Sequence, residues 1–508
     1  MGRLHYAKLN VLYGFMGKIV LMLIEFVARA IFIKVLGEEL LGINGVFTNV
    51  LQVLSLAELG MNNVVSFSFY KPLAEDDKDT ITGLINFYHK VYNWIAVAVL
   101  VIGLCLMPFI NILINTEHEI PYLHIIYLIF LADTVFSYLF VYKVSLIRAD
   151  QKGYIITKYD MVGNLVRVIL QIFFLITTRS LIIYLIIKVL YNVVINLICA
   201  KRSEREYPYI CNRSLVISNQ EKHNITSVIK SGFIYKISAV LLNSTDNILI
   251  SVIVGTVSVG LLSNYMTIIS GIGSIYVIVF GNLTASIGNL VGTENESKNL
   301  DIFEKLLLVS SWMAIVFSIC FFGLSKEFIC LWIGSKYVMS TGVVLSKAVM
   351  LFLSCSLQPL FSYREAVGLY KKTKYAMLAA AFINVILSII FGELWGTAGI
   401  LVASLVAMLS TYFWYEPVML YKDCFNSSVC KYFLTRAKDF TALILGLIII
   451  PYIMGVWKAD TWILWILKSG IYFLVSNIYC VLVYRWNNHY KELQNMFLSH
   501  LPKKLKKD

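Results

Sequence analysis

The sequence predicts an all-α polytopic membrane protein with about 14 transmembrane helices, arranged as two six-helix repeat bundles plus two extra C-terminal helices. Three observations support this prediction: the composition, the recurrence of long apolar runs, and an internal repeat. Of the 508 residues, 59% are hydrophobic and only 14% are charged, whereas soluble domains carry about 45–50% apolar and about 25% charged residues. This composition excludes a soluble enzyme.

Apolar runs of about 20 residues recur along the whole chain, each long enough to cross a bilayer core of about 30 Å. The breaks between them are too short for a folded soluble domain. The predicted helices span residues 10–36, 42–69, 88–114, 122–145, 155–178, 180–200, 227–253, 258–288, 302–324, 341–363, 375–393, 396–419, 440–457 and 461–484.

The longest break, residues 201–226, is polar and basic, and we predict that it is a cytoplasmic linker. It separates an N-terminal bundle, residues 1–200, from a C-terminal bundle, residues 227–419. Residues 420–486 then hold the two additional helices, and residues 487–508 are predicted to be a basic cytoplasmic tail.

The distribution of Lys and Arg predicts the orientation, because these residues concentrate on the cytoplasmic side of membrane proteins. With the N-terminus in the cytoplasm, 30 of the 43 lie in predicted cytoplasmic segments, about six lie on the opposite side, and the others lie within helices. One missed helix would invert every later segment, so this ratio favours an even number of helices with both termini cytoplasmic. We therefore attribute the net charge of +13 to topology and contact with membrane lipids, not to nucleic-acid binding.

An internal repeat relates the first and the seventh predicted helix at an offset of 218 residues. It aligns GFMGKIVLMLIEFVARAIFIKVLGEELLG with GFIYKISAVLLNSTDNILISVIVGTVSVG, so that Gly37 falls on Gly255 and Gly42 on Gly260. A second pair, RADQKGYIITKY and REAVGLYKKTKY, aligns at an offset of 216 residues. Two segments at nearly one offset predict a duplicated unit with an even number of helices, whose copies are related by a pseudo-twofold axis along the membrane normal.

Ionisable residues within the apolar runs are candidate functional residues, because a charge in the bilayer core costs several kcal/mol without a partner or a polar cavity. Lys18, Glu25 and Arg29 fall within roughly 40° on one helix face. The residues predicted to line a substrate cavity are Lys18, Arg29, Arg167, Lys188, Lys236, Asn243 and Asn247. The residues predicted to serve ion coupling are Glu25, Glu58, Asp133 and Asp246.

In this set cations outnumber acids, which suits a large, polar, anionic substrate. The alternative is internal ion pairing that fixes helix packing, as between Glu25 and Arg29 at i,i+4. Both interpretations remain open at the level of the sequence.

Motifs for catalysis, metals or cofactors are not indicated. The nine cysteines lack CxxC spacing, His118 and His124 lack the HExxH spacing, and no GxxxxGK[ST] phosphate loop occurs, which excludes ATP hydrolysis by this chain. Asp77-Lys78-Asp79 resembles a DxD metal motif but stands in a short break. We therefore predict a secondary transporter without a cofactor, with H⁺ or Na⁺ as a possible coupling ion.

Three segments carry a resemblance to a known family: LGEELLGINGVFTNVLQVLSLAELGM, NSTDNILISVIVGTVSVGLLSNY and YREAVGLYKKTKY. The chain resembles the Wzx-type flippases, polysaccharide transporters of the multidrug/oligosaccharidyl-lipid/polysaccharide (MOP) superfamily. The resemblance covers essentially the whole chain. It implies two bundles forming a V, a cationic central cavity and alternating access.

The resemblance also implies a bacterial plasma-membrane location and an undecaprenyl-pyrophosphate-linked oligosaccharide as the substrate, for surface or capsular polysaccharide biosynthesis. Glycosyltransferases and a polymerase of the same pathway are the implied partners. Two other classes stay open. A multidrug or organic-cation antiporter of the same superfamily would have about twelve helices and mainly acidic buried charges, and a polysaccharide polymerase or ligase would need a longer external loop.

The predicted topology is testable with reporter fusions. We expect cytoplasmic readouts at Asp77, Lys152, Lys222, Lys372 and Lys431, and external readouts near Glu117, Thr256 and Asp460. The measurement is the paired activity of a reporter active only in the cytoplasm and one active only outside. One inverted site would contradict the fourteen-helix topology and the repeat together.

Overall fold

The computed structural model of the chain describes residues 3–55, 61–116, 119–150, 152–218, 222, 225, 237–238, 240–242, 244–280, 283–455 and 457–500. The regular structure of these residues is helical, without a strand, which confirms the predicted all-α class. Among them, nine helices are long and apolar enough to cross a membrane, or ten if one bent pair forms a single span. The total of fourteen remains a prediction.

The chain divides into two compact units. Unit 1 comprises residues Met1–Ser263 and Met377–Ile400, and unit 2 comprises Asn264–Ala376 and Leu401–Asp508. Unit 1 therefore extends past the predicted linker and includes a segment from the C-terminal half. The predicted domain boundaries are not tested by this division and remain a prediction.

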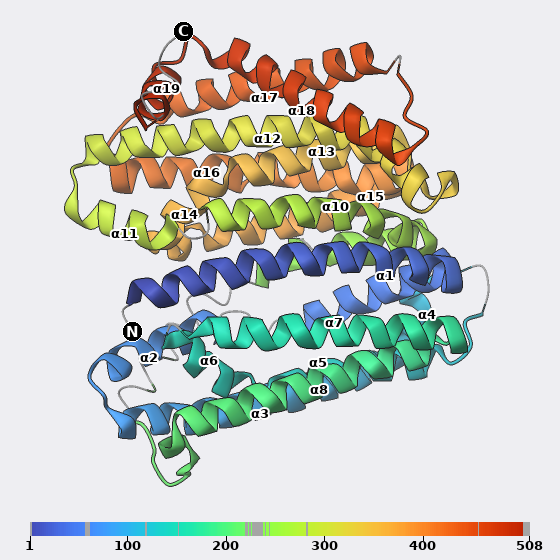
Figure 1. Ribbon diagram of the computed structural model, residues 1–508, viewed down its shortest axis with the longest axis vertical. Helices are drawn as coiled ribbons and strands as arrows, with labels where there is room; N and C mark the ends of the chain where they lie inside the picture. The colour runs from blue at the N-terminus through green and yellow to red at the C-terminus, as the bar shows by residue number, and fades with distance from the viewer. Residues whose placement is uncertain are drawn as a thin grey trace. The chain divides into compact units, whose positions relative to one another are not determined.

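The helices of unit 1 are α1 (Arg3–Leu54), α2 (Met61–Ala74), α3 (Lys78–Leu106), α4 (Ile110–Leu113), α5 (Leu123–Tyr138), α6 (Val141–Ala149), α7 (Gly153–Thr178) and α8 (Leu181–Glu206). The helices of unit 2 are α11 (Thr284–Thr293), α12 (Glu296–Trp332), α13 (Thr341–Ser356), α14 (Gln358–Ala366), α16 (Tyr412–Leu420), α17 (Cys430–Met454), α18 (Trp462–Tyr484) and α19 (Asn488–His500). Helices α10 (Thr256–Phe280) and α15 (Tyr370–Ser410) contribute to both units. Within unit 2, α12 packs against α13, α17 and α18 (Figure 1).

Two glycines divide the longest helices near the predicted breaks. Gly37 has φ 83° within α1, and Gly396 has φ 59° within α15. A positive φ carries little steric cost for glycine, which lacks a Cβ atom. The predicted ends at residues 36 and 393 therefore correspond to kinks within α1 and α15.

Gly42 and Gly260, which the sequence repeat aligns, lie in contact where α1 crosses α10. A Cβ atom on Gly42 would meet the carbonyl oxygen of Thr256 at 2.0 Å, and one on Gly260 would meet the amide nitrogen of Gly42 at 3.0 Å. Such close backbones require residues without side chains. Contact between equivalent positions is the arrangement expected near a pseudo-twofold axis, and it supports the predicted duplication.

The first part of the predicted linker packs on α3. Helix α8 continues to Glu206, and Asn86 of α3 then donates hydrogen bonds to the carbonyl oxygens of Asn212 and Leu215 at 2.9 and 3.0 Å. Lys152 joins this end of α8 by ion pairs of 2.8 Å with Asp150 and Glu206. Burial lowers the pKa of Lys152, but its hydrogen bonds to the two carboxylates outweigh burial and raise the pKa above its usual value.

Two C-terminal elements differ from the prediction: one helix begins earlier, and part of the predicted tail is helical. Helix α17 begins at Cys430, ten residues before the predicted start at 440, because the charges in its first turns are paired within the protein. The predicted tail from residue 487 forms α19 as far as His500. Asn487 caps α19, since its side-chain oxygen accepts a hydrogen bond of 2.9 Å from the backbone N–H of His489.

The glycine crossing generates a stability prediction. Gly42→Ala places a methyl group against the backbone of Thr256, and such overpacking costs about 1–3 kcal/mol. We expect a lower melting temperature of the detergent-solubilised protein. The control is Gly273→Ala on α10, where an added Cβ meets no atom within 4 Å. Equal melting temperatures for the two variants would contradict a close crossing.

Candidate functional site

In unit 1, Tyr184 of α8 lies within electrostatic range of two of the predicted cavity cations. Arg29 of α1 and Arg167 of α7 both interact electrostatically with its hydroxyl group. Arg29 donates a hydrogen bond to Ser263 of α10, and Arg167 donates bonds of 3.1 Å to Asn164 and Gln171. The structure therefore gathers predicted residues of α1 and α7 around one tyrosine.

The tyrosine is held in place by both neighbouring helices. Gln171 of α7 donates a hydrogen bond of 3.0 Å to the backbone carbonyl of Tyr184. The ring of Phe32, one turn beyond Arg29 on α1, packs edge-on against the ring of Tyr184 with centroids 5.1 Å apart. Ser263 accepts the hydrogen bond of Arg29 that is described above, and both arginines are intermediate in burial.

A second polar group lies along the same stripe of α8. Lys188, one turn after Tyr184, pairs with Asp133 of α5 at 3.2 Å, and Asn192, a further turn along, donates a hydrogen bond of 2.5 Å to Asp133. The side chain of Asp133 is 13% exposed and that of Lys188 is 32% exposed. A predicted cavity cation and a predicted coupling acid therefore form one ion pair.

Asp246 is the most buried of the predicted acids that the structure describes, with 6% exposure. Asn384, which is fully buried, donates a hydrogen bond of 3.3 Å to one carboxylate oxygen of Asp246. The neighbouring Thr245 approaches the Asn384 side-chain oxygen at 3.4 Å. This cluster contains amide and hydroxyl groups around a buried acid.

For the other predicted residues, the structure shows few contacts or does not describe the side chain. Asn247 is half-buried on the helical segment Val240–Ile253, and Glu25 is exposed on α1, within electrostatic range of Arg29. The side chain of Lys18, together with Glu58, Lys236 and Asn243, lies outside the described residues. The predicted facing stripe of the second repeat and the substrate cavity itself therefore remain predictions.

The sequence analysis missed the neutral residues of these groups. Tyr184 and Asn192 share a helix face with Lys188 at i,i+4 spacing, which was visible in the sequence. Ser263 and Asn384 are distant in sequence from their partners, and no local pattern marks them. The sequence analysis selected mainly charged residues, because a charge within an apolar run has an evident burial cost.

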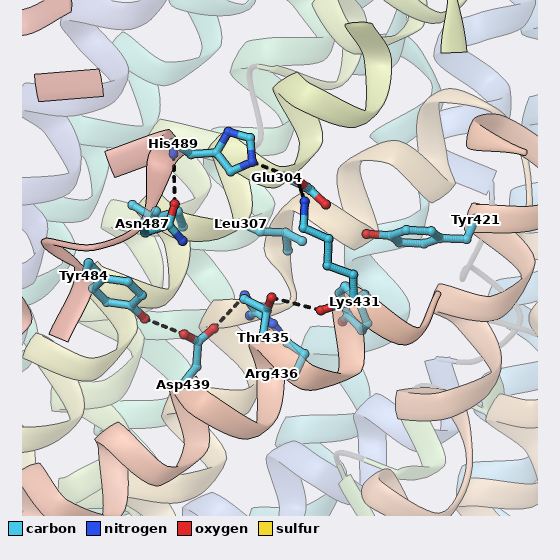
Figure 2. Close-up of a pocket in the computed structure, with 12 residues that line it drawn as sticks. Glu304, Leu307, Tyr421, Lys431, Thr435, Arg436, Asp439, Tyr484, Asn487 and His489 are labelled. Carbon is cyan, nitrogen blue, oxygen red and sulfur yellow. Dashed lines mark hydrogen bonds and ion pairs between the residues drawn. The ribbon is translucent and has the colours of Figure 1, made fainter. Parts of the chain in front are cut away.

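Unit 2 contains a separate pocket of about 60 Å³ among α12, α17, α18 and α19 (Figure 2). At its base, buried Arg436 pairs with Asp439 at 2.7 Å and donates a hydrogen bond to Ser311, while Tyr484 donates one of 2.6 Å to Asp439. The paired charges leave the base close to neutral. This balance suits water better than a charged ligand.

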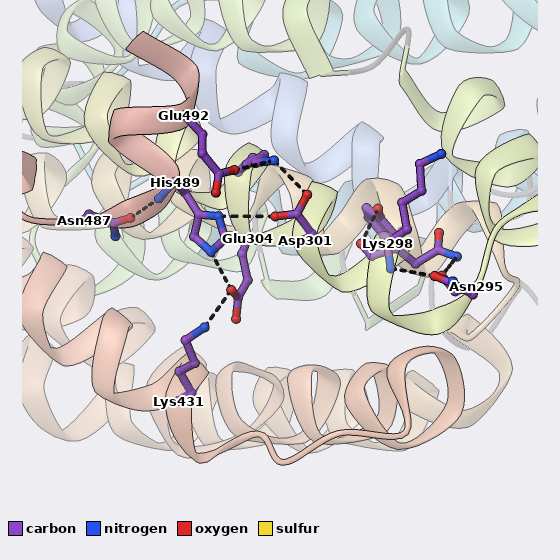
Figure 3. Close-up of polar contacts among 11 residues, drawn as sticks. Asn295, Lys298, Asp301, Glu304, Lys431, Asn487, His489 and Glu492 are labelled. Carbon is purple, nitrogen blue, oxygen red and sulfur yellow. Dashed lines mark hydrogen bonds and ion pairs between the residues drawn. The ribbon is translucent and has the colours of Figure 1, made fainter. Parts of the chain in front are cut away.

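At the rim of this pocket, Asp301, His489 and Glu492 bring potential metal-ligand atoms within 4.8 Å of one another. The ammonium group of Lys305 lies 2.7 Å from both Asp301 and Glu492 (Figure 3). This ammonium already provides the positive charge that a metal would bring, so we interpret the group as an ion-pair network.

The DxD-like motif has a structural role. Asp77 caps the start of α3, accepting hydrogen bonds of 3.0 and 2.6 Å from the backbone N–H and the hydroxyl group of Thr80. These bonds hold the pKa of the Asp77 carboxyl below its usual value.

Comparison with known proteins places this geometry in a known fold. The structure of the lipid II flippase MurJ in an inward closed conformation matches with a TM-score of 0.65 and 16% sequence identity, covering 94% of this chain and 99% of that chain. Inward-facing and outward-facing multidrug resistance MATE family transporters of the MOP superfamily match with TM-scores of 0.61 and 0.58, each at 16% identity. The chain has the fold of the MOP-superfamily transporters.

Within the MOP fold, the extent of the matches differs. The MATE structures cover 78% and 84% of this chain, while 93% and 98% of their own chains are covered. The MurJ structure covers more of this chain. No family model and no curated protein matches the sequence, so the comparison establishes the fold.

The Asp133–Lys188 pair generates a prediction for stability. Lys188→Gln leaves the Asp133 carboxylate without its cation, and Asp133→Asn leaves the lysine without its anion. Because both groups are partly exposed, we expect each single change to lower stability by about 1–2 kcal/mol, below the loss from breaking a fully buried pair. The double variant should regain most of the loss in thermal unfolding. Additive losses in the double variant would contradict pairing.

Proposed function

We propose that the protein is a flippase that moves lipid-linked oligosaccharide repeat units, carried on polyprenyl pyrophosphate, across the bacterial plasma membrane by alternating access. The single observation that carries this proposal is the pair of arginines around Tyr184, with Lys188 one turn away on the same helix. The fold shared with the lipid II flippase MurJ supports it.

The pyrophosphate group supplies the chemical reason. Arginine stays charged at any physiological pH, and its planar group binds phosphate oxygens with two parallel hydrogen bonds. Arg29 and Arg167 are partly exposed, so both can present donors to an anionic group. In this proposal, substrate phosphate replaces water at the arginines as the lipid passes.

For coupling, we propose Asp246 as the site that takes up H⁺ or Na⁺. Burial makes the charged form of a carboxylate costly and so favours uptake of a cation, and the side-chain amide of Asn384 donates a hydrogen bond of 3.3 Å to Asp246. Glu25, being exposed near Arg29, is the alternative. Asp133 is the weaker candidate because Lys188 already compensates its charge.

The rival function is export of drugs or organic cations, and the matched MATE structures are of multidrug resistance transporters. Deletion of the gene, followed by analysis of lipid extracts, separates the two. Full-length lipid-linked repeat units retained on the cytoplasmic leaflet would support the flippase. Normal surface polysaccharide together with a new sensitivity to cationic drugs would support the antiporter.

Arg29 generates the sharpest prediction for this function. Arg29→Ala should leave the amount of protein in the membrane near normal and abolish surface polysaccharide, because the phosphate loses a bidentate hydrogen-bond donor. Arg29→Lys should rescue only in part, since a point charge replaces the planar group. The measurement is surface polysaccharide normalised to the amount of protein in the membrane.

A double variant distinguishes substrate binding from internal pairing. If Arg29 only compensates Glu25, then Glu25→Gln combined with Arg29→Gln should restore transport. If Arg29 binds substrate, that double variant should remain inactive. A well-expressed double variant with normal polysaccharide would overturn the proposed role of Arg29.

A further inference from the structure

Charged side chains around His489 connect α19 to α12, and Lys431 of α17 joins the same network through Glu304 of α12 (Figure 3). The Nε2 atom of His489 lies 2.8 Å from Glu304, and its Nδ1 atom lies 3.4 Å from Asp301. Each ring nitrogen of this histidine thus faces a carboxylate of α12.

A neutral imidazole cannot satisfy both carboxylates, because it carries one N–H and one lone pair. With the proton on Nε2, the lone pair of Nδ1 would face the Asp301 oxygen. The Nδ1 atom is buried and makes no hydrogen bond within the described residues. The imidazolium form removes this conflict, since both of its nitrogens carry hydrogens.

The charges around the ring give the same result. Three carboxylates, those of Asp301, Glu304 and Glu492, face two ammonium groups: Lys305 pairs with Asp301 and Glu492, and Lys431 pairs with Glu304 at 2.9 Å. The other charged groups of the pocket, Arg436 and Asp439, pair with each other, and Tyr484 donates to Asp439. The network is therefore one positive charge short unless His489 is protonated.

We propose that His489 is a proton-binding site that latches α19 onto α12. The proton supplies the missing charge, and its loss leaves Asp301 facing a lone pair. Asn487 and His489 also line the pocket above the Arg436–Asp439 pair (Figure 2). Release of the latch would therefore open this pocket to solvent. By the predicted topology, this end of the bundle faces the cytoplasm, so the latch would respond to cytoplasmic pH.

Aromatic packing also holds α19 against α12, independently of the charge on His489. The indole ring of Trp312 of α12 stacks between Tyr484 and Tyr490, with centroids 5.8 and 5.6 Å away. This contact does not depend on pH near neutrality. Loss of the proton should therefore loosen α19 without detaching it from the bundle.

Hydrogen exchange of the full-length protein in lipid nanodiscs, measured by mass spectrometry between pH 5.5 and 8.5, tests the latch. After correction for intrinsic exchange, protection of peptides covering α19 should be highest at low pH. It should fall about two- to fivefold as the pH rises, which corresponds to one partly exposed charge pair.

Three variants separate the latch from a general effect of pH. His489→Gln should show the low protection at every pH. Asp301→Asn balances the charges without a proton, so it should keep protection high and remove most of its pH dependence. Lys491→Gln, an exposed change on the same helix, should keep the wild-type profile. A flat wild-type profile, or pH dependence retained in both His489→Gln and Asp301→Asn, would overturn the proposal.

Discussion

A charge inside an apolar helix bundle needs a partner, and this constraint explains much of the arrangement of the described residues. Lys188 has Asp133, Arg436 has Asp439, and Lys468 of α18 has Glu327 of α12 at 2.6 Å. Each pair fixes one helix against another or neutralises a charge within a helix. Arg167 of α7 differs, since its two hydrogen bonds go to the neutral side chains of Asn164 and Gln171. A cation whose hydrogen bonds go to neutral groups can still bind an anion, which connects the packing constraint to the proposed function.

Close helix approach is the second requirement of this architecture. At Gly42 and Gly260 two helices touch through their backbones, and at Gly37 the chain bends where other residues would be strained. Helices that meet through glycines can lie closer than side chains would permit. The same short segment, residues 256–263 of α10, supplies both the crossing contact and Ser263, the partner of Arg29. The crossing therefore positions part of the candidate site.

The sequence was sufficient to predict the all-α class and many helix ends, because composition and apolar run length are set by the bilayer. It predicted the start of α17 too late, because charged residues that are paired in the folded protein resemble those of a loop in the sequence. It also missed α19 as a helix. Among the residues of the candidate site, Arg29, Arg167, Lys188 and Asp133 were predicted from their charge, but Tyr184, Ser263 and Asn384 were not. Their roles depend on contacts between distant segments, which a single sequence does not display.

The central claim is that this protein moves lipid-linked oligosaccharides across a bilayer. The most direct test places the purified full-length chain in liposomes with a fluorescent polyprenyl-pyrophosphate oligosaccharide, and adds a glycosidase that cannot cross the membrane. Without a flippase, only the outer-leaflet substrate is cleaved. The account predicts that the wild-type protein makes nearly all of the substrate accessible, and that Arg29→Ala protein does not. Cleavage that stays at the protein-free level, in liposomes where the same protein transports an organic cation, would contradict it.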